Sequence, residues 1–166
     1  MLPVSDTVVV DPVRRQRYRF SRDGDDLLAE VETAPGGDVP EHVHPMQTEY
    51  WEVITGAVTF YIDGQPRSGR PGDRIGADAG IRHAFVNDGP DTALLKVRVS
   101  PANDLQTFLV EAARLARAGA FDAKGKPSSP RAAMALIALA VRHRRDIQIT
   151  TPAPLRLLNV AMRALP

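Results

Sequence analysis

Three of the four histidines and one glutamate are spaced in a pattern that suits a metal ion. His42 and His44 are separated by one residue, Glu49 follows five positions later, and His83 comes after a long interval rich in strand-forming residues. Alternate residues of a β-strand face the same side, so we expect His42 and His44 to project together from one strand. Imidazoles and a carboxylate form a ligand set for a divalent transition-metal ion. The spacing therefore predicts one metal site at these four residues.

The identity of the ion is left open by this ligand set. Iron, manganese, nickel, copper and zinc all bind imidazole nitrogen and carboxylate oxygen. Because histidine ligates as the neutral ring, we expect metal to be lost as the pH falls through about 6. Glu49, besides its role as a ligand, is a candidate proton acceptor. A buried Glu49 without a metal or another partner would cost several kcal/mol.

Strand alternation places further side chains near the predicted site. If Glu49 points inward, Trp51, Val53 and Thr55 point inward too, and His83 brings Phe85 to the same side. Trp51 and Phe85 are expected either to line an apolar small-molecule pocket or to be ordinary core residues. Gln47 lies between the ligands in sequence and is expected either to support a ligand or to face solvent.

The first hundred residues read as short strands separated by turns. Segments rich in aliphatic and β-branched residues alternate with glycine, proline, aspartate and asparagine at roughly 8–12-residue intervals, which favours an antiparallel barrel or sandwich. Asp63-Gly64 is a hairpin signal. The run from Arg14 to Phe20 alternates basic and aromatic residues and is expected to be an edge strand. The strands predicted around the metal site are Leu27–Thr33, Glu49–Thr55, Ala57–Ile62 and Thr92–Val99.

The remaining third of the chain is expected to be helical. Asn103 or Asp104 is positioned to cap a helix that ends near Ala118, and Ser129 followed by Pro130 predicts a second helix over 131–145. The second helix contains ten consecutive apolar residues over 132–141, so we expect it to pack against the strands or against a second subunit. Its His143 is expected to be unrelated to the metal site. A last helix is predicted after Pro154, with apolar residues at helical spacing at Leu155, Leu158, Met162 and Leu165.

Composition limits the class of protein. The chain has 166 residues, which favours one domain, and it has no cysteine, which fits a reducing compartment. It has neither a signal-peptide pattern nor an apolar run long enough to span a bilayer, so we expect a soluble, cytoplasmic protein. Residues 1–113 carry 11 basic and 18 acidic side chains and residues 114–166 carry 10 and 2. We expect these halves to neutralise each other rather than to bind an anionic membrane. No nucleic-acid-binding motif is present.

The glycines and the metal-site residues together resemble the two signature motifs of the cupin superfamily. The first motif corresponds to Gly36, His42, His44, Glu49 and Gly56. The second motif corresponds to Gly72, Gly80, His83 and Asn87, and it departs at one position, Asp78, where cupins usually have proline. Nine of the ten fixed positions therefore agree.

The resemblance covers about residues 25–100 and implies a mainly β, cupin or jelly-roll-like antiparallel barrel that holds one metal at His42, His44, Glu49 and His83. We expect residues 1–102 to form this barrel with its N-terminal strands and residues 103–166 to form a helical extension packed on the barrel or on a dimer partner. The resemblance also suggests a homodimer. It implies a metalloenzyme of dioxygenase or isomerase type acting on a small organic molecule, or a non-catalytic cupin that binds or senses such a molecule.

Overall fold

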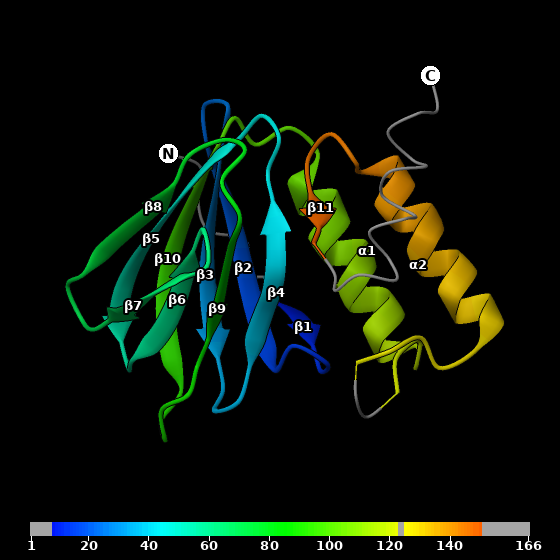
Figure 1. Cartoon of the computed structure of the whole chain (residues 1–166), viewed down its shortest axis with the longest axis horizontal. Helices are drawn as coiled ribbons and strands as arrows, with labels where there is room; N and C mark the ends of the chain where they lie inside the picture. Colours follow the sequence, from blue (N-terminus) through cyan, green and yellow to red (C-terminus); the bar gives the residue numbers. More distant parts are fainter. Residues whose placement is uncertain (1–7, 123–124, 151–166) are drawn as a thin grey trace.

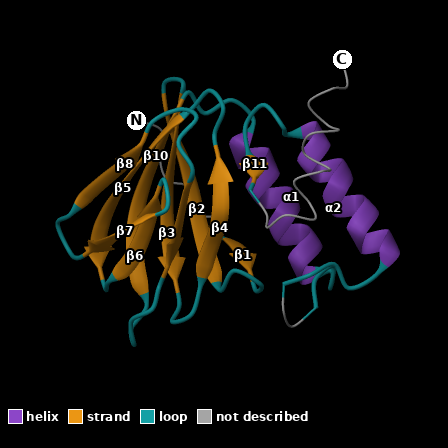
Figure 2. Cartoon of the chain, in the orientation of Figure 1, coloured by secondary structure: helices purple, strands orange, loops and turns teal. Residues whose placement is uncertain are grey.

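The computed structural model describes residues 8–122 and 125–150 as two facing antiparallel sheets with a helical layer at one side (Figures 1 and 2). The predicted helix after Pro154 lies outside the described residues. The strands of the first sheet are β1 (Val9–Asp11), β2 (Gln16–Asp23), β3 (Asp26–Thr33), β5 (Thr48–Thr55), β8 (Arg74–Ala77) and β10 (Ala93–Ser100). Those of the second are β4 (Asp38–Val43), β6 (Val58–Ile62), β7 (Gln65–Gly69), β9 (His83–Val86) and β11 (Gln148–Ile149).

The strand order is β1-β2-β3-β10-β5-β8 in the first sheet and β11-β4-β9-β6-β7 in the second. Alternate side chains of each strand face the other sheet, and they form one apolar core that includes Phe60, Leu95 and Val53, each at most 1% exposed. Two sheets that enclose a single core in this way form the predicted jelly-roll-like architecture, which is confirmed. The described strands form two separate hydrogen-bonded sheets and not one closed barrel.

The four strands predicted around the metal site are present, with ends displaced by at most one residue. The Asp63-Gly64 hairpin is also present, because Ile62 pairs with Gln65 across it. The prediction of an edge strand near residues 14–20 is wrong, since β2 lies between β3 and the three-residue strand β1. The inward orientation predicted for Thr55 is wrong too, because a bulge shifts the pairing of β5 with β10 between Leu95 and Leu94, and Thr55 is exposed.

Two helices follow the strands, as expected. Helix α1 (Leu105–Arg117) begins after Asp104, whose side chain makes no capping hydrogen bond. Helix α2 (Pro130–Arg142) begins after Ser129, whose hydroxyl oxygen accepts a hydrogen bond from the backbone N–H of Ala132 at 3.1 Å. Helix α2 ends at Arg142, three residues earlier than predicted. The described residues include no helix that is long and apolar enough to cross a bilayer.

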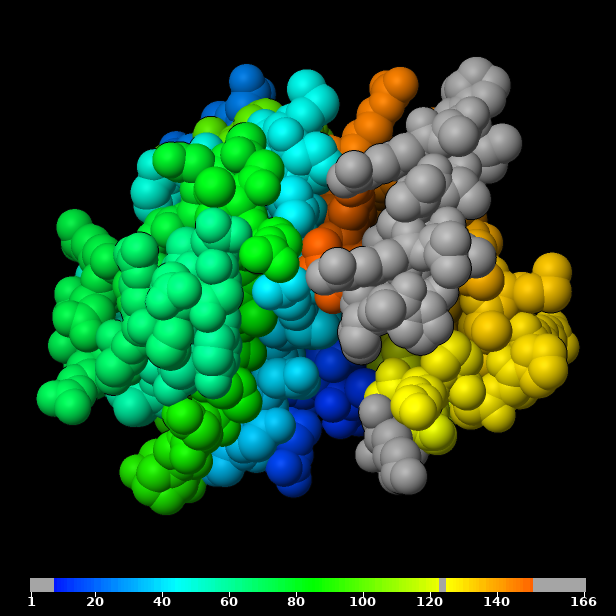
Figure 3. Space-filling model, in the orientation of Figure 1, coloured from blue at the N-terminus to red at the C-terminus, as the bar shows by residue number. Residues whose placement is uncertain are grey.

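The chain returns from the helices to the sheets through β11. Gln148 pairs with Val43 and Ile149 with His42, so β11 adds an edge to the second sheet beside β4. Figure 3 shows these orange-red residues against the cyan residues of β4. At the other end of the extension, Leu105 is 3% exposed and belongs to the core between the sheets. The described part of the extension thus packs on the strands of its own chain.

Candidate metal centre

The four predicted ligands meet at one point between the sheets. His42 lies in β4 and His44 one residue past its end, Glu49 lies in β5, and His83 begins β9. Glu49 comes from the first sheet and the histidines from the second, so the site bridges the two sheets. One ligand atom from each residue lies within 4.8 Å of the others, and the three histidines are at most 4% exposed.

The separations between these atoms suit ligands of a single ion. Glu49 Oε2 is 3.1 Å from His44 Nε2, 3.0 Å from His83 Nε2 and 3.9 Å from His42 Nε2. The Nε2 atoms of His42 and His44 are 3.3 Å apart. Two ligands held at right angles by bonds of about 2.1 Å are about 3 Å from each other, and two opposite ligands about 4.2 Å. The donor set therefore fits a divalent transition-metal ion.

Backbone carbonyl groups set which nitrogen of each ring faces the centre. Nδ1 of His42 lies 2.9 Å from the carbonyl oxygen of Pro40, and Nδ1 of His83 lies 2.9 Å from that of Ile81. Nδ1 of His44 lies 2.6 Å from the carbonyl oxygen of Asp146. A carbonyl oxygen only accepts, so each Nδ1 carries the proton and each neutral ring turns the lone pair of Nε2 inward. Three imidazole lone pairs and a carboxylate oxygen thus converge with no fixed proton between them.

Burial and the neighbouring charges act on the pKa values of these groups. Burial lowers the pKa of His42 to about 4, against the opposing effect of Glu49. Burial also acts to lower the pKa of His44, but the hydrogen bond and the negative charge of Glu49 outweigh it and raise that pKa. For Glu49, burial acts to raise the pKa, but the surrounding imidazoles outweigh it and hold the pKa well below its usual value. The carboxylate is therefore ionised at neutral pH.

An apolar cavity of about 70 Å³ adjoins the four ligands. Trp51 and Phe85 are 3% and 5% exposed, belong to the core and line this cavity, and their role in a small-molecule pocket stays a prediction. The ring of Trp51 lies 5.2 Å from that of His83. Tyr18 also lines the cavity. Its hydroxyl donates a hydrogen bond to Oε1 of Gln16, so this polar group has a partner within the protein.

Three other residues considered in the sequence, Gln47, His143 and Asn87, lie outside the ligand cluster. Gln47 neither supports a ligand nor faces solvent, because it is fully buried and its amide N–H groups donate to the carbonyl oxygens of Pro101 and Ala102 at 3.0 Å. The ring of His143 is buried against Phe108 at 5.7 Å and is not part of the cluster. Asn87, a residue of the second signature motif, stabilises a turn by accepting a hydrogen bond from the N–H of Gly89.

The helical extension contributes residues that sequence reasoning missed. Leu105 and Leu109 of α1, and Ile147 after α2, line the cavity. The Asp146 carbonyl that receives the His44 ring belongs to the same turn as Ile147. The apolar pattern of α1 could have indicated a buried face, but a backbone carbonyl has no signature in a sequence.

Comparison with known proteins places the strand-rich part of the chain in a family. The model described as a cupin domain matches residues 29–97, which include all four predicted ligands. Among solved structures, an uncharacterised conserved protein with a double-stranded β-helix domain from Klebsiella pneumoniae is 25% identical. The TM-score is 0.50, and the match covers 54% of this chain and 79% of that one.

Two curated proteins are similar in sequence over the same part. Germin-like protein 5-1 of Oryza sativa subsp. japonica is 35% identical over 82 residues, which are 45% of this chain and 36% of that protein. Tetracenomycin polyketide synthase protein TcmJ of Streptomyces glaucescens is 30% identical over 75 residues, which are 45% of this chain and 50% of that protein. The chain thus spans half or less of each relative. With the signature residues and the two facing sheets, these matches show that residues 29–97 belong to a cupin domain.

Proposed function

We propose that the protein is a metal-binding monocupin, a metalloenzyme acting on a small organic molecule by dioxygenase-type or isomerase-type chemistry. One observation carries this proposal. Three Nε2 lone pairs, each fixed by a carbonyl group behind the ring, converge with Glu49 beside an apolar cavity. Outer hydrogen bonds of this kind orient the histidine ligands of metal sites.

In this proposal His42, His44, Glu49 and His83 hold one divalent ion of iron, manganese, nickel, copper or zinc. Such an ion polarises oxygen atoms of a bound molecule, and a redox-active ion also supports reactions with O₂. Glu49 supplies negative charge at the centre. Its low pKa makes it a weak base, so we assign Glu49 to ligation rather than to the proton transfer considered from the sequence.

The cavity restricts the substrate class. Its volume of about 70 Å³ is roughly half that of a cavity of ~150 Å³ that takes up benzene. The lining residues other than the ligands are aromatic, such as Trp51 and Phe85, or aliphatic, and they offer no charged partner. The favoured substrate therefore has an oxygen-bearing end for the ion and a short apolar body. Short diketones and keto acids fit this description, whereas phenols, which are larger than benzene, exceed it and serve as the size control.

The relatives support the cupin scaffold but no particular reaction. Only a domain-sized part of the germin-like protein and of the tetracenomycin polyketide synthase protein is matched. We therefore take from them the cupin scaffold and the expectation of a small organic ligand, and propose no specific reaction from their names.

Metal analysis followed by turnover measurements tests the proposal. Protein purified without added metal is expected to contain about one transition-metal ion per chain, and the wild type should consume O₂ or isomerise a member of a panel of phenols, diketones and keto acids. Oxygen uptake with a redox-active ion supports the dioxygenase, whereas loss of α-hydrogen into D₂O without uptake supports the isomerase. Protein that binds none of the five metals at micromolar concentration contradicts both.

The alternative is a cupin that binds or senses a small molecule without turnover. The same cavity supports it, because the described residues around the cavity offer no general acid or base other than the four ligands and Tyr18, whose hydroxyl already donates to Gln16. Tryptophan fluorescence separates the alternatives, since Trp51 is the only tryptophan and lines the cavity. Saturable quenching by a compound of the panel, with no product after prolonged incubation, favours the binding protein.

We also propose that residues 1–102 and 103–166 are a cupin barrel and its helical extension, and that the chain forms a homodimer. Tyr50 and Tyr61 on the strands are exposed by 51% and 39%, and they offer apolar surface for a second copy. Light scattering coupled to size exclusion is expected to give twice the chain mass of 18.1 kDa. A mass of one chain at micromolar concentration would exclude the dimer.

A further inference from the structure

The three histidines of the cluster obtain their outer hydrogen bonds in two different ways. His42 and His83 each bond to the carbonyl group two residues earlier in their own segment, at Pro40 and Ile81. His44 instead bonds to the carbonyl of Asp146, which is 102 residues away in the chain, at 2.6 Å. Two rings are thus oriented locally, and the third depends on the helical extension.

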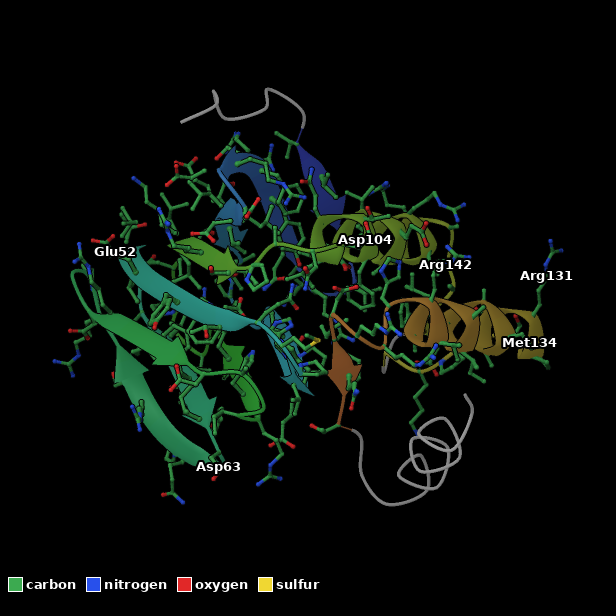
Figure 4. All side chains as sticks on the ribbon, turned by 90° about the horizontal axis from the view of Figure 1, so that it is seen from above. Glu52, Asp63, Asp104, Arg131, Met134 and Arg142 are labelled. Carbon is green, nitrogen blue, oxygen red and sulfur yellow. The ribbon has the colours of Figure 1, made fainter. Side chains whose placement is uncertain are left out.

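The Asp146 carbonyl is held by a turn that follows α2. The carbonyl oxygen of His143 accepts hydrogen bonds from the N–H groups of Asp146 at 2.9 Å and of Ile147 at 3.0 Å. The backbone N–H of Asp104, at the start of α1, lies 3.4 Å from Oδ1 of Asp146. The turn is therefore tied to the end of α2 and to the start of α1, and Figure 4 labels Asp104 at α1.

Strand β11 fixes the other side of this turn. Ile149 pairs with His42 itself, and the hydroxyl of Thr150 donates to Oε1 of Glu41 at 2.8 Å. Between these anchors Ile147 is 6% exposed and, with Leu105 and Leu109, lines the cavity beside the ligands. The same turn thus touches both the His44 ring and the space that a ligand would enter.

We propose that the turn at residues 143–147 is a positioning element of the metal centre. Its Asp146 carbonyl orients His44, and its Ile147 side chain closes the cavity and limits the apolar body of the ligand. This inference rests on the proposed metal-binding function. The turn lies outside the residues that the cupin-domain model matches, which end at residue 97.

Exchange of the ring N–H protons with water tests the orienting role. In protein labelled with ¹⁵N-histidine, Ile147→Ala is expected to speed exchange of the His44 Nδ1 proton by about tenfold, because the turn opens more often. The Nδ1 protons of His42 and His83, with carbonyl partners in their own segments, are expected to change by less than twofold. They are internal controls that a general loss of stability would not spare.

Zinc affinity provides the second readout. Loss of an outer hydrogen bond typically weakens metal binding by roughly 10–100-fold, and we expect Ile147→Ala to fall in this range when measured by chelator competition. Ile147→Val, which keeps most of the side chain, should show an exchange rate of the His44 proton and a zinc affinity close to those of the wild type. Met134→Ala is the matched control, since Met134 is 72% exposed on α2 and is seen in Figure 4 at the end of that helix away from the strands.

A milder variant protects the test against a folding defect. Thr150→Val removes the donor to Glu41 without altering the core and is expected to shift the exchange of the His44 proton in the same direction. If both variants fold and exchange this proton as slowly as Met134→Ala, the proposal is overturned. The exchange measurement also works on metal-free protein, so wild type that fails to bind Zn²⁺ would refute the proposed function while the role of the turn is still decided.

Discussion

At the scale of single residues, the site depends on the direction of three lone pairs. Each ring is turned by a hydrogen bond from Nδ1 to a carbonyl oxygen, so that Nε2 faces the centre. A carboxylate oxygen lies about the same distance from two of these nitrogens. Like partial charges brought together at 3 Å repel unless a cation or a proton lies between them. A metal ion satisfies all four groups at once.

The charge of Glu49 is expected to dominate metal affinity at this scale. Glu49→Gln keeps the shape of the side chain and removes its charge, and we expect the dissociation constant for Zn²⁺ to rise beyond the roughly 10–100-fold cost of losing an outer partner. Glu52→Gln is the matched control, because Glu52 lies in the same strand, pairs with Arg74 at 3.2 Å and is far from the helices in Figure 4. Chelator competition should show no change for the control. Equal effects of the two variants would contradict the ligand assignment.

The pH dependence of metal binding follows from opposite shifts in two rings. Glu49 raises the pKa of His44, so His44 is expected to take up a proton first as the pH falls. Burial lowers the pKa of His42 to about 4, so this ring stays neutral well below the usual value of 6.5. Because Zn²⁺ must displace the proton from His44, affinity should already weaken as the pH falls toward 6.5 and weaken more steeply near 4. Isothermal titration from pH 8 to 4 measures this, and constant affinity over that range would refute it.

At the scale of elements, the turn between β5 and β6 lies close against the start of β10. Gly56 has a φ of +75°, and a Cβ at that position would lie 2.7 Å from the Cα of Ala93. Gly64, in the β6–β7 hairpin, has a φ of +77° with nothing within 4 Å. The two glycines therefore share a left-handed backbone but differ in the space around them.

Alanine substitutions at Gly56 and Gly64 separate the cost of a left-handed backbone from the cost of steric overlap with Ala93. Gly64→Ala is expected to lower the free energy of unfolding by about 1–2 kcal/mol, the cost of a left-handed backbone for an L-residue. Gly56→Ala should add about 1–3 kcal/mol for overpacking against Ala93. Urea denaturation followed by Trp51 fluorescence measures both. Equal losses for the two variants would show that Ala93 moves aside freely.

At the scale of the whole molecule, the extension and the sheets share their interior. Leu105 belongs to the core between the sheets, and β11 is an edge of the second sheet. Arg142 of α2 also pairs with Glu111 of α1 at 2.7 Å, which joins the helices to each other. We therefore expect the described parts of the chain to unfold together.

Metal removal tests this coupling. An ion that binds only the folded chain at 100 times its dissociation constant adds about 2.7 kcal/mol. For a chain of this length that corresponds to a rise in Tm of about 5–10 °C. Scanning calorimetry with and without a chelator should show one transition that moves by this amount. Two transitions, of which only one moves, would indicate that the extension is independent of the metal centre.

The sequence by itself determined the strands, the jelly-roll-like fold and the four residues that meet at the centre. It did so because strand alternation and turn residues are local properties, and because the histidines and the glutamate belong to two short motifs of fixed spacing. Thr55 escaped prediction because a single bulge reverses strand parity.

Only the tertiary structure decided that Asp146 and Ile147 belong to the site, 102 positions from His44 in the case of Asp146. A backbone carbonyl is the same in every residue, and its role depends on which ring the folded chain brings to it. The size of the cavity was likewise set by side chains of both sheets and α1 packing together. Contacts of this kind carry no pattern along the chain, since they are fixed by the docking of the extension on the strands.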